Sequence, residues 1–203
     1  MQKMLKGKTC RKFGVSLWFY RNLTMKQRKN LLLEKKKMIL KKTSNFATKL
    51  KSKQLVSALY GNLKLQTLKK NLTLSQKASG KNAHVFFSFL EKRLDSSLVQ
   101  LKLAPTFMAA KQLINHKKVF INNKVMKSPG YLLKAGDQVS LDPSAHSSVK
   151  NYLTQILKKN VFFYKSLNFE VNYKTLQAIF LFSPQQIHYP TQIHVESVLK
   201  ALL

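Results

Sequence analysis

The chain has 203 residues, which is enough for one large domain or two small ones. It carries 37 Lys and Arg residues against 7 Asp and Glu residues, a formal net charge of +30. A compact fold with this charge repels itself, so we expect a polyanionic partner: nucleic acid first, with an anionic membrane surface as the weaker alternative. The single cysteine excludes a disulfide framework and a cysteine-rich zinc site, and the five histidines form no metal-binding pair. We therefore expect no metal and no cofactor. No apolar run approaches the ~20 residues of a membrane span, so we also expect no membrane segment.

Positive charge is concentrated in the first ninety residues, which hold 22 Lys and Arg residues and one acid, Glu34. We therefore expect residues 1–90 to form a basic, mainly helical domain that binds a polyanion. The stretch up to Arg28 has no acid and resembles a mitochondrial transit peptide in that respect. Transit peptides are rich in Arg and Ser, whereas this stretch is mostly basic through lysine, so we expect Met1 to begin the working protein.

Apolar spacing predicts helices along this basic domain. One spans Leu31–Leu40 and carries Lys35, Lys36 and Lys37, which form either a solvated face or, as we expect, a phosphate-binding cluster. A second basic stretch, 49–54, precedes Tyr60-Gly61, where glycine predicts the end of a helix. Leucines continue the apolar pattern to residue 72, and the polar stretch 75–82 is typical of a linker.

Residues 91–142 predict a separate small module. Leu90, Leu94, Leu98 and Leu101 follow the spacing of one amphipathic helix. Pro105 breaks this helix, and the Thr106 hydroxyl can cap a second helix that buries one apolar face and ends at residues 115–118.

Short strands follow the second helix. Residues 119–121 form one strand, and Asn122-Asn123 predicts a tight turn, since asparagine tolerates a positive φ. Residues 125–126 return, turns follow at 128–130 and 135–137, and residues 139–141 close a small sheet. The predicted fold class is α+β, with two helices packed on a short-stranded sheet.

The remaining residues, 143–203, give a weaker pattern. A turn at 142–144 precedes a predicted helix at 149–157, and strands are predicted at 170–173 and 178–182. Prolines at positions 184 and 190 break the chain after these strands.

The motifs of residues 91–142 occur in a recognisable order. They read R-L-D, A-P-T, A-x-Q-L-I-N-H, V-x-I-N, S-P-x-Y and K-x-G-D, and together they resemble the S-four RNA-binding domain. The version with A-P-T and S-P-x-Y is most similar to that of the small-subunit ribosomal protein S-four family. The upstream segment K-L-K-x-K-Q…Y-G also resembles this family, and Lys8–Arg11 resembles its opening, where an extended arm lies on rRNA.

The resemblance implies a structural protein of the small ribosomal subunit rather than an enzyme. It implies binding to the 5′ domain of small-subunit rRNA during assembly, a neighbouring protein of the S-five type, and a position near the mRNA entry channel. It also implies that residues 143–203 return to pack on the N-terminal domain. The scarcity of arginine, with four among 37 cations, indicates an AT-rich genome and favours the mitochondrial ribosome, with the chloroplast or a bacterial cytoplasm as alternatives.

Candidate RNA-binding residues follow from the basic stretches and from matching the family pattern position by position. They are Arg11, Lys35, Lys36, Lys37, Lys49, Lys51, Lys53, Arg93, Thr106, Lys111, Gln112, His116, Lys117, Lys118, Asn122, Lys124, Tyr131 and Lys134. Arg93 has an alternative, a salt bridge to Glu91, Asp95 or the turn, and we expect Asp95 to be structural. Tyr131 either stacks on a base or, as we expect, belongs to the core.

The chain departs from the family at four positions. Phe107 and Leu132 stand where the family usually has arginine, and Lys117 and Asn123 stand where it usually has glycine. These departures put individual RNA contacts in doubt more than the fold.

Two other functions share the module. Pseudouridine synthases carry a catalytic R-L-D segment, but in a large domain after the module, and too few residues follow here for such a domain. Ribosome-rescue and heat-shock RNA-binding proteins also carry the module, but the long basic N-terminal half argues against them.

Overall fold

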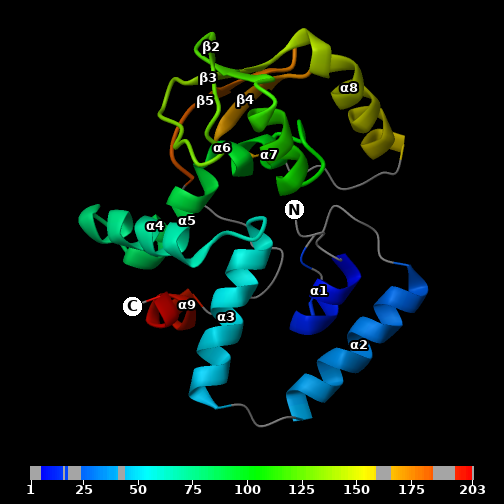
Figure 1. The fold of residues 1–203 in the computed structure, drawn as a ribbon, viewed down its shortest axis with the longest axis vertical. Helices are drawn as coiled ribbons and strands as arrows, with labels where there is room; N and C mark the ends of the chain where they lie inside the picture. The colour runs from blue at the N-terminus through cyan, green and yellow to red at the C-terminus, as the bar shows by residue number, and fades with distance from the viewer. Residues whose placement is uncertain are drawn as a thin grey trace. The chain divides into compact units, whose positions relative to one another are not determined.

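The computed structural model describes residues 6–15, 17, 24–40, 44–158, 166–184 and 195–202. The chain divides into two compact units, residues 1–77 with 188–203 and residues 78–187, which we describe separately (Figure 1). The first unit is helical and the second combines helices with an antiparallel sheet, so the predicted α+β class is confirmed.

The first unit contains five described helices: α1 (Lys6–Phe13), α2 (Met25–Leu40), α3 (Asn45–Leu59), α4 (Leu65–Lys77) and α9 (Val195–Leu202). Helix α9, at the end of the chain, packs beside α3 and α4, so distant parts of the sequence share one helical body (Figure 1). The N-cap of helix α3 is Ser44, whose side-chain oxygen accepts a hydrogen bond from the Ala47 amide. Its C-cap is Tyr60, and Gly61 follows with a φ of 74°, in agreement with the predicted glycine stop.

The expectation of an extended arm at the N-terminus is wrong for residues 6–13, which form α1. Cys10 and Phe13 are three positions apart and therefore share one face of this helix. Both are buried with Leu17 and with Ala58 of α3. Burial of this apolar face stabilises the segment as a helix, which the many lysines of the segment made hard to predict. Residues 1–5 of the expected arm lie outside the described part of the chain.

The second unit contains α5 (Asn82–Glu91), α6 (Leu94–Gln100), α7 (Phe107–Asn115) and α8 (Pro143–Lys158). Its strands are β1 (Val119–Ile121), β2 (Lys124–Val125), β3 (Gln138–Leu141), β4 (Phe169–Asn172) and β5 (Gln177–Phe180). They form an antiparallel sheet in the order β2-β1-β3-β5-β4. The predicted Asn122-Asn123 turn joins β1 to β2 with φ values of 48° and 62°. Helices α6 and α7 pack on each other next to the sheet (Figure 1).

The leucine pattern predicted one helix, and the structure has two. All four leucines, at positions 90, 94, 98 and 101, are buried. However, α5 ends at Glu91, and Arg93 takes an extended conformation with φ −65° and ψ 142°. Arg93 forms a bridge with Leu132, and this pairing interrupts the helix without disturbing the burial of the leucines.

The predicted domain boundaries also differ from the compact units. Of the expected return segment 143–203, α8, β4 and β5 belong to the second unit, because β5 pairs with β3 and extends the sheet of the module. Helix α9 belongs to the first unit and packs on its helices, as expected for the whole segment. The boundary before the module lies near residue 78 rather than residue 91, since α5 belongs to the second unit.

Both ends of α7 have regular caps. The Thr106 side-chain oxygen accepts a hydrogen bond from the Ala109 amide, as predicted. At the other end the Lys117 amide donates to the Ile114 carbonyl and the Lys118 amide donates to the Leu113 carbonyl, which is the Schellman arrangement. This arrangement places Lys117 at a φ of 60°, where the side chain of any residue but glycine costs free energy.

Substituting Lys117 with glycine should raise the free energy of unfolding of the second unit by about 1 kcal/mol, because glycine removes the cost of the left-handed conformation. Urea denaturation of the full chain, followed by circular dichroism, measures this change. Lys117→Ala is the matched control: it removes the same charge but keeps a Cβ, and it should leave the stability nearly unchanged. A glycine variant no more stable than the alanine variant would contradict the argument.

Candidate nucleic-acid interface

The candidate cations of the first unit lie on the surface of its helices. Arg11 extends from α1, Lys35, Lys36 and Lys37 follow one another on α2, and Lys49, Lys51 and Lys53 follow the start of α3. All are exposed except Lys53, which is half-buried. The described acid among them is Glu34, whose carboxylate lies 3.9 Å from the exposed Lys37 ammonium. An exposed pair of this kind is weak, so it leaves most of the positive charge of this unit available to phosphates.

The candidate residues of the second unit lie along α7, just after its end and at the turns that follow β1 and precede β3. Gln112, His116, Lys117, Asn122, Lys124 and Lys134 are exposed, and Thr106, Lys111, Lys118 and Tyr131 are half-buried. His116 is the C-cap of α7, and Lys117 and Lys118 follow it directly. The carbonyl end of a helix carries partial negative charge, which stabilises the positive charges of Lys117 and Lys118 at this position.

Arg93 differs from the other candidates because it is buried, with 6% of its surface exposed. Its Nε donates to Asp95 Oδ1 at 3.0 Å and its Nη2 donates to Asp95 Oδ2 at 2.8 Å. Asp95 Oδ1 also accepts from the Ser96 amide, and the Lys111 ammonium lies 4.0 Å from Asp95 Oδ2. The structure therefore favours the ion-pair alternative for Arg93, and Asp95 has the structural position that we expected.

Lys111 is partly drawn into the same cluster. Burial lowers the pKa of its ammonium, while the charge of Asp95 opposes this shift and that of Arg93 adds to it. The side chain keeps 21% of its surface exposed. Lys111 can therefore still contact a phosphate, although its ammonium also interacts with the Asp95 carboxylate.

The S-P-x-Y segment, residues 128–131, is held against the start of α6 by backbone hydrogen bonds next to the Arg93–Asp95 pair. The Leu94 amide donates to the Tyr131 carbonyl at 2.9 Å, and the Asp95 amide donates to the Pro129 carbonyl at 3.1 Å. A Cβ on Gly130 would lie 3.3 Å from Arg93 Nη1, so a larger residue would crowd the guanidinium. Two motifs that are 33 positions apart thus form one structural unit, and it fixes the loop that carries Tyr131 and Lys134.

Asp137 organises the neighbouring turns, and sequence reasoning missed it. Its Oδ1 accepts from the Asn122 side-chain amide at 2.9 Å, and its Oδ2 accepts from the Lys134 backbone amide at 2.8 Å. The Tyr131 hydroxyl lies 3.5 Å from Oδ2, and the pKa of this hydroxyl is raised by burial, by the charge of Asp137 and by this hydrogen bond. The acid in K-x-G-D gave a signal, but its contact with Asn122, on the other side of β2, could not be read from the motif.

Two more of the predicted RNA ligands, Asn122 and Tyr131, therefore have structural contacts. Asn122 uses both ends of its side-chain amide, since its Oδ1 also accepts from the Gln138 amide at 3.0 Å. Tyr131, which is half-buried, directs its hydroxyl to a carboxylate within the protein. The exposed lysines around them, Lys117, Lys124 and Lys134, remain able to reach an external phosphate.

This arrangement fits the binding of a polyanion. Among the described residues there is no group of three or more His, Cys, Asp or Glu side chains placed to hold a metal ion. Within the same residues, no helix combines the length and the apolar character that crossing a bilayer requires. What the surface offers is lysine, which acts as a flexible point charge toward phosphate.

Replacing Asp95 with alanine should lower the free energy of unfolding of the second unit by about 3–5 kcal/mol, because the Arg93 guanidinium would stay buried without its counter-charge. The matched control is Glu34→Ala, which breaks the exposed pair with Lys37 and should change stability by less than ~0.5 kcal/mol. Urea denaturation of both full-length variants makes the comparison. Equal, small effects would mean that the buried pair does not stabilise the unit.

Comparisons with known proteins agree with the sequence motifs. A family model described as the S4 domain matches residues 92–139. The small ribosomal subunit protein uS4m of Marchantia polymorpha is 33% identical over 190 residues, which cover 93% of this chain and 95% of that protein. The uS4m protein of Reclinomonas americana is 31% identical over 160 residues, 76% of this chain and 64% of that protein. The uS4 protein of Rickettsia typhi is 27% identical over 195 residues, 96% and 95% of the two chains.

These relatives confirm the resemblance and the prediction that the chain is not an enzyme, because all three are named as ribosomal proteins, a structural and non-enzymatic family. The similarity extends over nearly the whole of this chain and of the Marchantia protein, well beyond the S4 domain itself. The chain belongs to the family of the small ribosomal subunit protein uS4.

Proposed function

We propose that this protein is a structural constituent of a small ribosomal subunit and binds the 5′ domain of its rRNA during assembly. The observation that carries the proposal is the excess of exposed lysine on both compact units, one of which contains the S4 domain. Phosphate contacts supply most of the affinity of such a surface and carry no sequence information. Selectivity then comes from shape, because a folded RNA presents its phosphates in a fixed pattern.

The proposed rRNA ligands of the second unit are the side chains that the structure leaves accessible. They are Lys111, Gln112, His116, Lys117, Lys118, Lys124 and Lys134. Phe107 and Leu132 stand where the family usually has arginine, and both are half-buried here. In this proposal Lys117 and Lys118 compensate for the missing charge of the unit as a whole, since both carry a cation to its surface just after the end of α7.

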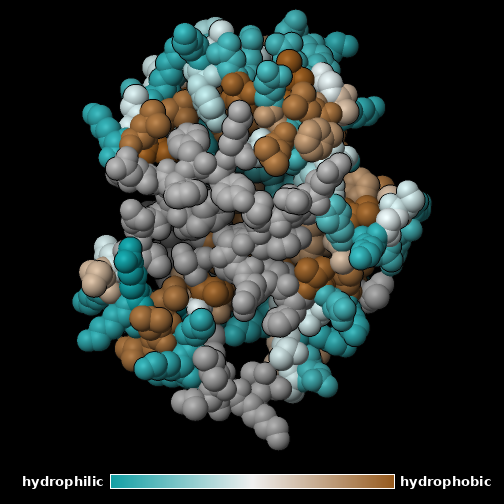
Figure 2. Space-filling model, turned by 180° about the vertical axis from the view of Figure 1, so that it is seen from behind, coloured by the Kyte–Doolittle hydropathy of each residue, from teal (hydrophilic) through white to brown (hydrophobic). Residues whose placement is uncertain are grey.

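The proposed protein partner is a neighbouring small-subunit protein of the S-five type. Support comes from exposed apolar side chains of the second unit, because RNA offers little to bury them. Ile179, Leu181 and Phe182, at the end of β5, are each at least 40% exposed. Hydrophobic patches among hydrophilic side chains are visible on the face shown in Figure 2. We also place the protein near the mRNA entry channel, as the family resemblance implies.

We place the protein in the mitochondrial matrix, in the mitochondrial ribosome. Two of the relatives described above are named as mitochondrial proteins, uS4m. The preference for lysine over arginine supports an AT-rich organellar genome. Chloroplast and bacterial uS4 proteins are also similar to this chain, so the alternatives are a plastid or a bacterial ribosome.

Reversing the charge of Lys117 and Lys118 together, to glutamate, should weaken binding to the small-subunit rRNA 5′ domain at least ~10-fold, because two proposed phosphate contacts become repulsive. The matched control is Lys150→Glu with Lys174→Glu, which changes the net charge equally at exposed positions of α8 and of the turn after β4. Filter binding at fixed salt measures both affinities, and thermal melting checks the folds.

The same assay tests the proposed function as a whole. The unmodified protein should prefer the 5′ domain over an equally long fragment from elsewhere in the same rRNA. If both double variants lost the same affinity, Lys117 and Lys118 would not be specific rRNA ligands. If the unmodified protein bound both RNAs equally well, the 5′ domain would not be its target.

A further inference from the structure

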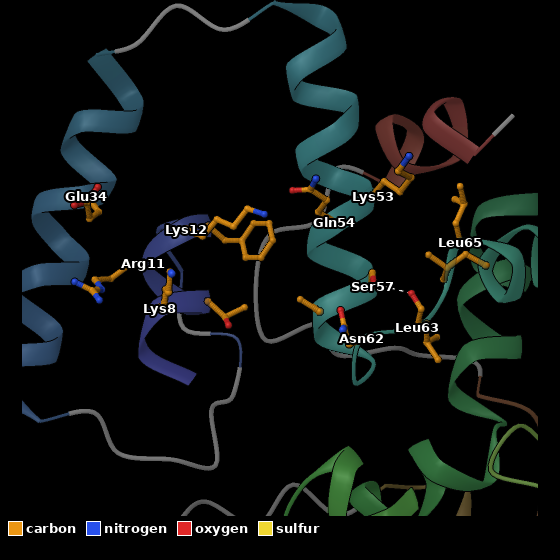
Figure 3. A pocket seen from close by; sticks show the side chains of 14 residues that line it. Lys8, Arg11, Lys12, Glu34, Lys53, Gln54, Ser57, Asn62, Leu63 and Leu65 are labelled. Atoms are coloured by element: carbon orange, nitrogen blue, oxygen red, sulfur yellow. Dashed lines mark hydrogen bonds between the residues drawn. The ribbon is translucent and has the colours of Figure 1, made fainter. Parts of the chain in front are cut away.

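A basic pocket lies within the first unit, apart from the S4 domain. Its volume is about 770 Å³, which is in the range of small-molecule sites in proteins. Its lining comes from α1, from α3, from the segment that leads into α4 and from the first turn of α4, with Glu34 of α2 at its margin (Figure 3). None of these residues belongs to the second unit, so the pocket is formed by the helical body alone.

The floor of the pocket is apolar. Phe13, Ala58, Leu63 and Leu68 line it, and each has at most 7% of its surface exposed. The Ser57 hydroxyl donates to the Leu63 carbonyl at 2.7 Å and thereby fixes the chain after α3 (Figure 3). A floor of this kind offers nothing to a bare inorganic anion, but it suits a flat organic ring.

The rim of the pocket is cationic. Lys8, Arg11, Lys12 and Lys53 line it, against the acid Glu34, which already has Lys37 at 3.9 Å. Lys12 extends from α1 toward α3, and its ammonium lies 5.7 Å from the centroid of the Phe13 ring. A ligand that reaches the apolar floor must therefore carry negative charge close to its ring.

Two side-chain amides complete the lining. Gln54 lies on α3, at the side toward which Lys12 extends, and Asn62 lies just after the end of that helix (Figure 3). An amide group donates and accepts at once, which is the pattern required to pair with the edge of a nucleobase. Unpaired bases of folded RNA are recognised in this way, splayed out of the helix with their edges hydrogen-bonded.

We propose that this pocket receives one unpaired nucleotide of the bound RNA, with the base on the apolar floor beside Gln54 and Asn62 and the phosphate at Lys8, Arg11 and Lys12. The inference rests on the proposed rRNA-binding function and gives the first unit a selective contact in addition to its field of lysines. A helical surface with charge alone binds any RNA, whereas a pocket that admits one base distinguishes a site with an unpaired nucleotide from a continuous duplex.

The decisive variant removes the amide without changing the charge. Gln54→Ala should weaken binding of the full-length protein to the small-subunit rRNA 5′ domain about fivefold, the value of one or two hydrogen bonds. Gln76→Ala on α4 is the matched control, since Gln76 is exposed and lies outside the pocket, and it should bind like the unmodified protein. The salt dependence should be the same for all three proteins.

A second pair of variants tests the rim. Lys12→Gln and Lys29→Gln each remove one exposed charge, but only Lys12 lines the pocket, and Lys29 is not among the candidate RNA-binding residues. Lys12→Gln should weaken binding more than Lys29→Gln does. Chemical probing of the RNA backbone should show one nucleotide that is protected by the unmodified protein and by the two control variants but is exposed with Gln54→Ala and Lys12→Gln.

The outcomes separate this inference from the proposed function. If the unmodified protein prefers the 5′ domain but both pocket variants match their controls and leave the probing pattern unchanged, the pocket inference is overturned and the proposed function stands. If the unmodified protein shows no preference for the 5′ domain, the proposed function fails first. Thermal melting of each variant verifies that a loss of binding does not come from unfolding.

Discussion

The buried ion pair between Arg93 and Asp95 is the constraint on which the second unit depends. It lies where α5 and α6 meet, and its backbone neighbours pair with residues 129–132. Removing either partner would leave a charge in the interior, which is far more costly than losing an exposed pair. The pair lies where the backbone of Leu94 and Asp95 binds the loop of Tyr131, and the Tyr131 hydroxyl in turn contacts Asp137.

This use of charge contrasts with that of the rest of the chain. Arg93 and Asp95 satisfy each other inside the protein, whereas the lysines of α2, α3 and the end of α7 lie exposed with few acids near them. The fold tolerates this surplus because the charges are spread over two units, each with its own apolar core. A polyanionic partner relieves the remaining repulsion.

The sequence predicted the elements whose signals are local. The Thr106 cap, the Asn122-Asn123 turn and the glycine after Tyr60 depend on neighbouring residues, and all were found. The sequence did not predict the elements that depend on contacts between distant residues. The break at Arg93 requires Leu132, the helix α1 requires Ala58, and β5 joins the module because it pairs with β3.

The candidate site divides in the same way. Exposed lysines could be named from charge density, since a solvated cation needs no partner within the protein. For Arg93 the motif left an ion pair and an RNA contact as alternatives, and its contact with Asp95 decides between them. The partner that Asn122 and Tyr131 share, Asp137, becomes evident only in the folded structure. The sequence around Gln54 did not predict a pocket, because much of the pocket lining comes from helices other than α3.

The most direct test of the central claim, that exposed lysines on both units supply the affinity by neutralising phosphates, is the salt dependence of binding to the small-subunit rRNA 5′ domain. If roughly 6–10 phosphates are neutralised, the affinity should fall on the order of 10³–10⁵-fold between 50 and 200 mM monovalent salt, or less steeply where the RNA is single-stranded. A fall of less than ~10-fold over this range would mean that few phosphates are contacted, and would contradict the account.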